Sequence, residues 1–191
     1  MKTMFKRSLI IVATVLLLQG CAAAVIAGTA SAVTAANDRR TIGSQLDDNN
    51  IEIKAGLAID EVDRLEKFAH INVVSFNGIV LLVGQVANEE MKREAQHSIE
   101  SVSGIRKIHN QIRIGSNIGV TSQTHDSWLT SKVKTQLLTA KNISSNNIKV
   151  VTENAEVFLM GLVTQAESTQ AVNIARNVSG VERVIKVFEY L

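Results

Sequence analysis

Proline is absent from this chain of 191 residues, cysteine and tryptophan each occur once, and aromatic residues make up only 4% of it. A single cysteine excludes an intramolecular disulfide, so the fold must depend on its hydrophobic core. At 46% hydrophobic residues the composition is ample for such a core, and the length suits one medium domain or two small ones. The missing prolines have no single meaning.

Motifs for the common kinds of active site are also missing. The glycines are isolated, so there is neither a Gly-x-Gly-x-x-Gly loop nor a Walker motif to bind phosphate. Four histidines lack the spacing or carboxylate neighbours of a metal site, and we interpret them as solvated surface residues. They are His70, His97, His109 and His125. We interpret the acidic pairs Asp47-Asp48 and Glu89-Glu90 as groups that cap helix starts. We therefore expect no enzyme activity, no cofactor and no bound metal.

The first twenty residues have the pattern of a secretion signal. Lys2, Lys6 and Arg7 form a positive start, and the apolar run 9–18 has the length of a signal peptide rather than of a membrane-spanning helix. We predict that residues 1–20 are removed, which leaves 17 basic and 18 acidic residues and changes the net charge from +2 to −1. A slightly acidic, exported chain without a basic stripe is not expected to bind nucleic acid.

The tetrad Leu18-Gln19-Gly20-Cys21 follows this signal directly. It resembles the lipobox of bacterial lipoproteins, in which the cysteine carries a diacylglyceryl thioether and usually an N-acyl chain. The resemblance implies lipidation at Cys21, and a buried cysteine in an apolar segment is the alternative. Several acyl chains anchor a protein far more firmly than one. Because Ala22 rather than aspartate follows, resemblance to proteobacterial lipoproteins implies the outer membrane, facing the periplasm.

The rest of the chain contains two copies of one pattern. Gly84 and Gly161 are 77 residues apart, and the run 102–105 (VSGI) returns at 178–181 as VSGV. We predict a lipidated cysteine and Ala-rich tether over 21–43, a first module over 44–115, a linker over 116–120 and a second module over 121–191. Two copies of about 70 residues indicate duplication rather than a solenoid.

Each copy predicts the same order of elements. A helix (about 49–59 or 126–139) precedes a strand (71–76 or 148–152), a tight turn, a glycine-bearing strand, a second helix and a last strand (108–114 or 184–190). Asn77-Gly78 favours a type I′ hairpin turn. Thr164 and Glu167 form a capping box, and Gly104 and Gly180 are placed for left-handed helix caps. The order αββαβ predicts an α+β fold, a three-stranded mixed sheet packed on two helices.

This pattern resembles a known family. Val-x-Leu-x-Gly-x-Val, an alanine-bearing helix, Val-x-Gly-Val and a strand are similar to the BON domain, and two copies behind a lipobox resemble the dual-BON outer-membrane lipoproteins. The resemblance covers nearly the whole chain from Cys21. Its most specific pieces are Asp47-Asp48, Trp128 and the run 152–164 (TENAEVFLMGLVT). Copy one departs from the pattern at Gly56, which interrupts its first helix.

Both faces of each glycine-bearing strand are apolar. Val80, Leu82, Gly84 and Val86 share one face, which we expect to meet the helices, with Gly84 and its counterpart Gly161 letting a helix backbone approach closely. A bulge is the alternative reading of these glycines. A sheet with one solvated face should alternate apolar with polar residues, so the second apolar face must be covered. We predict that the modules pack sheet against sheet, with an external protein partner as the alternative.

The first helix of the second copy is expected to have two unlike faces. Leu129, Val133 and Leu137 fall in one arc at about 100° per residue and face the core. A second set points roughly the opposite way: Trp128, Ser131, Lys132, Thr135 and Leu138. Tryptophan favours the headgroup boundary of a membrane, and Lys132 and Lys134 would add about 1 kcal/mol each near an anionic leaflet.

The sequence thus predicts a phospholipid-binding face in the second copy, made of Trp128, Leu138, Lys132, Lys134, Ser131 and Thr135. Residues 121–191 carry a net charge of +1 against −3 for residues 41–115, which suits an anionic surface. Asn50 stands at the Trp128 position in copy one, which argues against a purely structural tryptophan. Trp128 could instead fold over the linker, or bind a protein partner.

The family resemblance adds expectations of its own. It implies that the second BON domain binds anionic phospholipids such as phosphatidylglycerol and cardiolipin. It also implies a role in envelope integrity, enrichment at the division site and contact with outer-membrane assembly proteins. The competing hypothesis is a periplasmic adaptor that binds proteins without recognising lipid.

Overall fold

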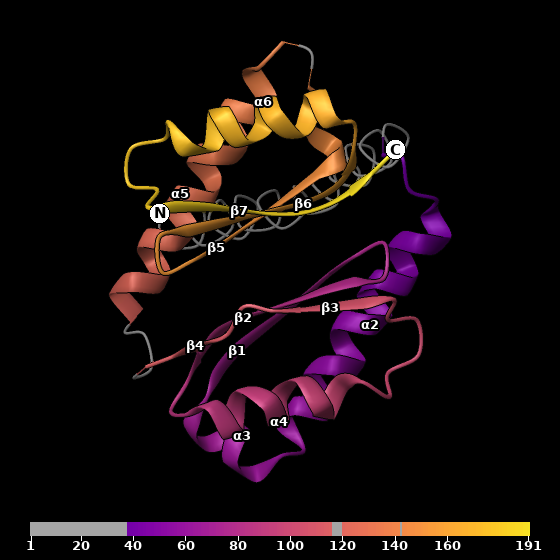
Figure 1. Ribbon diagram of the computed structural model, residues 1–191, viewed down its shortest axis with the longest axis vertical. Coiled ribbons are helices and arrows are strands. Elements are labelled where there is room, and N and C mark those ends of the chain that lie inside the picture. Colours follow the sequence, from indigo (N-terminus) through magenta and orange to yellow (C-terminus); the bar gives the residue numbers. More distant parts are fainter. Residues whose placement is uncertain (1–37, 116–119, 142) are drawn as a thin grey trace, which may run out of the picture. The chain divides into compact units, whose positions relative to one another are not determined.

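A computed structural model describes residues 38–115, 120–141 and 143–191. Residues from Arg39 to Leu191 form one compact unit, drawn in colour in Figure 1. The predicted signal peptide, Cys21 and nearly all of the predicted tether lie outside the described residues. So does most of the predicted linker, 116–120, although its last residue already belongs to a helix.

Both modules have the expected order of elements. Module one contains α2 (Ile42–Asp60), α3 (Asp63–Phe68), β1 (His70–Phe76), β2 (Ile79–Val86), α4 (Glu89–Ile99), β3 (Lys107–Asn110) and β4 (Arg113–Ile114). Module two contains α5 (Val120–Thr139), a 3₁₀ turn (Ser145–Asn147), β5 (Ile148–Glu153), β6 (Glu156–Val163), α6 (Gln165–Arg176) and β7 (Arg183–Tyr190). Each sheet is mixed, because the central strand β2 or β6 pairs antiparallel with the strand before it and parallel with the strands after the second helix. The predicted α+β fold is confirmed.

Three local features of module one differ from the prediction. Its first helix begins at Ile42 rather than near residue 49 and continues through Gly56, whose missing side chain faces open space. A short helix, α3, follows where none was predicted. The last strand is split, since the Asn110 side chain binds the Lys92 carbonyl and accepts from the Ile112 amide, 3.2 Å away. This local turn directs Ile112 into the core and separates β3 from β4. In module two, α5 likewise starts at Val120 rather than near residue 126.

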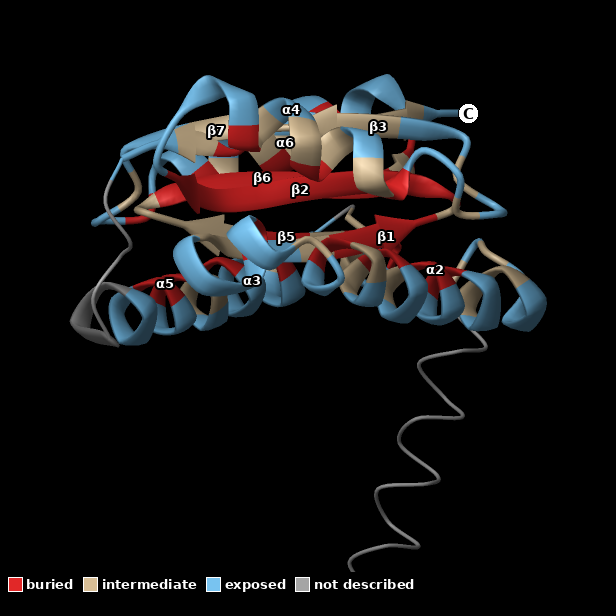
Figure 2. Cartoon of the chain, turned by 90° about the horizontal axis from the view of Figure 1, so that it is seen from below, coloured by how far each residue is buried: buried red, intermediate tan, exposed pale blue. Residues whose placement is uncertain are grey.

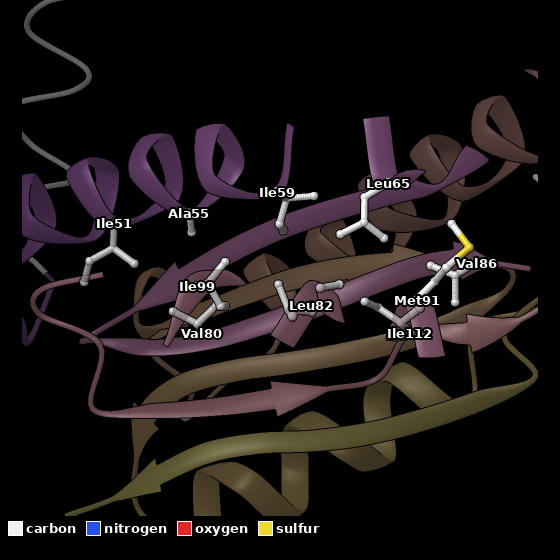
Figure 3. Packing of buried hydrophobic residues seen from close by; sticks show 11 residues of the cluster. Ile51, Ala55, Ile59, Leu65, Val80, Leu82, Val86, Met91, Ile99 and Ile112 are labelled. Carbon is white, nitrogen blue, oxygen red and sulfur yellow. The ribbon is translucent and has the colours of Figure 1, made fainter. Parts of the chain in front are cut away.

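Each module has its own hydrophobic core between its helices and its sheet. In module one Ile51, Ala55 and Ile59 of α2 point toward Val80 and Leu82 of β2 (Figure 3). In module two the corresponding helix residues are Leu129, Val133 and Leu137, as predicted, and they belong to a separate core. Alternate residues of the central strands therefore face the helices, which confirms the predicted strand faces.

A third core lies between the two sheets. Leu81 and Val83 of β2 are fully buried in one cluster with Phe158 and Met160 of β6. This confirms the prediction that the modules pack sheet against sheet. Figure 2 shows the consequence, because β2 and β6 are buried along almost their whole length. In the described residues each sheet therefore has helices on one face and the other sheet on its second face.

Ion pairs join the modules around this third core. They are Lys149 with Glu52 at 2.7 Å, Arg106 with Glu189 at 2.6 Å, Arg39 with Glu167 at 2.8 Å, and Arg113 with Glu156. The Arg39 guanidinium, aided by the Thr164 cap, holds the pKa of the Glu167 carboxyl at about 2. Arg39 precedes module one in sequence yet binds module two, so the chain is tied across the interface from its first described turn.

The glycines of the central strands have a different role from the predicted one. A Cβ at Gly84 would lie 1.9 Å from the carbonyl oxygen of His70, and one at Gly161 would lie 2.3 Å from that of Asn147. The His70 carbonyl belongs to the first residue of β1, and the Asn147 carbonyl belongs to the last residue of the 3₁₀ turn before β5, so neither belongs to an α-helix. The predicted close approach of a helix backbone is therefore wrong. Glycine is required because the adjacent backbone crosses the space that a side chain would fill.

The turn and cap predictions are confirmed in most respects. Asn77 and Gly78 have positive φ angles of 52° and 73°, as a type I′ turn requires. Thr164 and Glu167 form the capping box of α6. Gly104 and Gly180 have positive φ as predicted, but α4 ends at Ile99 and α6 at Arg176. These two glycines therefore turn the loop beyond the helices rather than capping them.

Candidate functional site

Buried aspartates hold the first helix of each module against its hairpin. The Asp48 carboxylate accepts hydrogen bonds from the backbone amides of Asn77 and Gly78, at 2.7 and 2.8 Å. Asp126 of α5 accepts from Asn154 and Ala155 at 2.7 and 2.9 Å in the same way. The prediction that Asp48 caps a helix start is wrong, because it lies well inside α2 and caps a strand turn. Glu89 and Glu90 do lie in the first turn of α4. The 78-residue spacing of the two aspartates was the sequence signal for this shared role.

The outward face of α5 exposes the residues predicted from the sequence. The Trp128 side chain is 53% exposed and Leu138 is 65% exposed, while the core residues of the same helix are buried. No part of the chain that the structure describes covers Trp128, and most of the predicted linker lies outside that part. The Lys132 ammonium lies 4.5 Å from the centre of the Trp128 ring and donates to the Ser179 carbonyl at 3.2 Å. The lysine is therefore held beside the indole, a favourable cation–π arrangement.

The six predicted residues form two groups along the helix. Trp128 and Lys132 are in contact, whereas Leu138 lies ten residues beyond Trp128, a rise of about 15 Å. Lys134 and Leu138 line one cleft of about 240 Å³ with Leu137 and Ile148. The face thus offers an aromatic and a lysine near one end, and a leucine and a lysine near the other.

The two predicted hydroxyl residues lie between these groups. Ser131 donates to the Ser127 carbonyl at 3.0 Å, and Thr135 donates to the Ser131 carbonyl at 2.9 Å. Their hydrogens are used within the helix, so each hydroxyl can offer only its oxygen to a ligand. We therefore expect Ser131 and Thr135 to contribute little recognition of an anionic group.

The helices α2 and α5 lie side by side and run in opposite directions. Gln123 near the start of α5 is 3.4 Å from the His70 ring beyond the end of α2. Lys134 near the end of α5 lines the same 290 Å³ cleft as Gln45 and Asn49 near the start of α2. Figure 2 shows both helices on one side of the unit and α4 and α6 on the other. This pairing of distant segments was not foreseen from the sequence.

Among the described residues, no group of His, Cys, Asp or Glu side chains is arranged to hold a metal ion. His97 and His125 are exposed, as predicted, but His70 and His109 are half-buried. Burial, with the charge of Lys107, lowers the pKa of His109. Burial, with the charge of Asp126, raises the pKa of Glu153 to about 7.

Each of the two modules matches the BON-domain family, the first at residues 41–116 and the second at residues 125–191. The chain belongs to the BON-domain family. It is 40% identical over 186 residues to "Outer membrane lipoprotein DolP" of Haemophilus influenzae, covering 97% of this chain and 96% of that protein. It is a DolP-like BON lipoprotein by this similarity.

Two further relatives are similar over shorter stretches. A "21 kDa hemolysin" of Actinobacillus pleuropneumoniae is 39% identical, covering 81% of this chain and 79% of that protein. "Osmotically-inducible protein Y" of Escherichia coli is 30% identical, covering 75% and 72%. In the part of the chain that the structure describes, no helix combines the length and apolarity needed to span a bilayer.

Proposed function

We propose that this BON protein is an outer-membrane lipoprotein, anchored through acyl chains on Cys21 and facing the periplasm, whose second module binds anionic phospholipid. Its role is non-enzymatic and supports envelope integrity, at the division site and in contact with outer-membrane assembly proteins. The observation that carries the lipid-binding proposal is the exposed Trp128 with Lys132 held against its ring. The similarity to an outer-membrane lipoprotein supports the location.

The chemistry of this face suits a membrane surface better than a small anion. An indole favours the headgroup boundary, where its ring meets apolar chains and its N–H finds partners. Lys132 and Lys134 add attraction to an anionic leaflet of about 1 kcal/mol each. Leu138 supplies apolar contact at the far end of the helix. Phosphatidylglycerol and cardiolipin both offer the negative charge that this face requires.

A titration with vesicles of phosphatidylglycerol tests the proposal on residues 22–191, which contain the whole compact unit. Trp128→Glu should weaken binding by tenfold or more, about 1.4 kcal/mol, because it places a carboxylate against the anionic surface. Replacing both Lys132 and Lys134 with Gln should weaken binding less and remove most of its salt dependence. Far-ultraviolet circular dichroism should show that the fold survives, since these side chains are exposed.

Ile114→Glu is the matched control, because Ile114 is an exposed apolar residue of β4 and lies on neither first helix. It should leave vesicle binding unchanged. Equal binding by Trp128→Glu and the unchanged chain would overturn lipid recognition at α5. If the backbone NMR shifts do not change when lipid is added, and an envelope protein is captured, the adaptor role would be favoured instead.

A further inference from the structure

Helix α2 of module one carries a second apolar stripe on the side turned away from its core. Ile42, Leu46, Ile53 and Leu57 are 68%, 58%, 62% and 59% exposed. At about 100° per residue these four lie within an arc of roughly 60°, opposite the buried residues of the same helix. We call them the α2 stripe.

A helix on the surface of a globular protein normally has one apolar face and one polar face. The α2 stripe gives this helix two apolar faces. Its four side chains expose on the order of 300 Å² of apolar surface, the size at which a patch is often functional. We therefore expect another molecule to cover the stripe.

The stripe and the proposed lipid-binding face of α5 open on the same side of the unit. Lys149 of β5 binds Glu52 of α2 at 2.7 Å, so the α2 edge of one sheet lies over the α5 edge of the other. The facing flanks of the two helices are polar, with Gln45 and Asn49 opposite Lys134. Each outward arc lies next to this polar flank, and Figure 2 shows both helices turning exposed residues to the same side.

When the modules are aligned with an offset of 78 residues, apolar residues on the outward face of one first helix correspond to polar residues on the other. Ile53 and Leu57 correspond to Ser131 and Thr135 of α5, and Asn50 corresponds to Trp128. On α5 the two large apolar residues, Trp128 and Leu138, lie at the two edges of the outward arc. On α2 the apolar residues of the stripe lie between the corresponding edges. Both first helices therefore present large apolar side chains to one common surface.

We propose that the α2 stripe is a second membrane contact, which enters the headgroup boundary of the bilayer beside α5. This inference rests on the proposed function, because it takes the same membrane as the occupant. With two antiparallel helices in contact, the unit would lie flat against the leaflet rather than touch it at one helix.

The small area of the stripe argues for a membrane rather than a second copy. A stable dimer buries about 800 Å² on each partner, more than twice what the stripe offers. A membrane contact needs less area when the chain is already tethered. Helix α2 begins 21 residues after Cys21, which limits it to roughly 70 Å from an acylated cysteine. At the high effective concentration that such a tether creates, a weak apolar contact is occupied.

The charges beside the stripe distinguish it from the α5 face. Lys54 is the cation of α2, and at about 100° per residue it shares a flank of the helix with Asp47, whereas Asp60 falls within the arc of the stripe. The stripe thus lacks the lysine pair of α5. Its contact is apolar, so we expect it to depend little on headgroup charge or on salt.

The test uses the mature lipidated chain, reconstituted through its acyl chains into vesicles of phosphatidylethanolamine and phosphatidylglycerol. Because Cys21 is the only cysteine and is acylated, Ile53→Cys supplies a unique thiol for an environment-sensitive fluorophore. The label should shift to the blue and be quenched about twofold or more by spin-labelled lipid, also at high salt. His97→Cys on α4, whose side chain is 86% exposed, is the control and should not be quenched.

A label at Ile53 that is quenched no more than the one at His97 would overturn the proposal. So would a label that is already shielded on the soluble chain 22–191 in the absence of vesicles, or that is shielded only by contact between two copies. Ile53→Ser with Leu57→Thr copies the residues of module two and should fold normally. In chains labelled instead at Leu46→Cys, this double change should reduce lipid quenching about twofold or more; unchanged quenching would also overturn the proposal.

The single tryptophan reports the α5 contact separately in the same molecules. If Trp128 emission shifts on vesicles while the Ile53 label does not respond, the second contact fails and the proposed function stands. If neither responds, both fail. A response at Ile53 with none at Trp128 supports the stripe and removes the proposed role of α5.

Discussion

The two modules hold their hairpin turns by the same carboxylate but compensate its charge differently. In module one Asp48 also binds the Arg40 guanidinium and the Ser75 hydroxyl, each at 2.7 Å. In module two the corresponding Asp126 has two backbone amides, and the neighbouring Glu153 is acidic rather than basic. The duplicated fold thus keeps its hairpin anchor, whereas the surrounding charges have diverged. In module one Arg40 neutralises the carboxylate, whereas no ion pair to Asp126 or Glu153 is formed within the described part of module two.

The largest expected effect tests whether the modules are independent at all. Leu81 and Leu82 are neighbours in β2 and both fully buried, but Leu82 lies in the core of module one and Leu81 in the core between modules. Because both side chains are fully buried, shortening either one would leave a cavity. Leu81→Ala and Leu82→Ala should therefore each lower the free energy of unfolding by about 3–5 kcal/mol. Urea denaturation checks this. Near-neutral behaviour of Leu81→Ala would mean that the sheets separate in solution.

Removing the hairpin carboxylates should affect module one more than module two. Asp48→Ala should lower the free energy of unfolding by about 3–4 kcal/mol, because it removes a buried carboxylate that binds the Arg40 guanidinium, the Ser75 hydroxyl and two backbone amides. Asp126→Ala should cost about 1–3 kcal/mol, since it orphans two amides but relieves repulsion with Glu153. Both values follow from urea denaturation at neutral pH. Equal losses would contradict the proposed difference in compensation.

The acidic pair of module two should give the protein a pH-dependent stability. Burial and the charge of Asp126 raise the pKa of Glu153 from 4.5 to about 7. As pH rises between these values, the unfolded chain releases a proton that the folded chain keeps, so the free energy of unfolding falls. Solvent screening of this half-buried group limits the fall to about 1–2 kcal/mol.

Glu153→Gln should remove this part of the pH dependence, as measured by urea denaturation across that range. The same position in module one is Phe76, which cannot titrate. A Gln variant that keeps the full slope would assign it to other groups.

The smallest expected effect concerns the hairpin turn itself. Ala155 has a φ of 59° where module one has Gly78 at 73°, a conformation that disfavours a Cβ. Ala155→Gly should therefore stabilise the protein by about 0.5–1 kcal/mol. Gly78→Ala should destabilise it by more than 1 kcal/mol, because its Cβ would meet the Gly104 carbonyl at 2.8 Å. Thermal unfolding of both variants checks the sign, and a shift of the same direction in each would contradict the argument.

Periodicity and turn chemistry were sufficient to predict the order of elements in both copies. Strands, hairpin turns and the capping box depend on neighbours within a few residues, and so Asn77-Gly78 and Thr164 with Glu167 could be read directly. The exposed position of Trp128 also followed from helical spacing. The α2 stripe follows the same helical spacing, so it too can be read from the sequence.

Long-range placement is what local patterns did not reveal. The strand glycines make room for the backbone of a neighbouring strand, and Asp48 caps a hairpin about 30 residues away. Such contacts join segments that are far apart in the sequence, and no periodic pattern marks them. An apolar second sheet face required a cover, and the chain supplied it from its own duplicate. Local sequence therefore determined each module, since short-range backbone geometry specifies helices and hairpins. Only the folded chain placed α2 beside α5, because that arrangement depends on which two surfaces bury the most apolar area against each other.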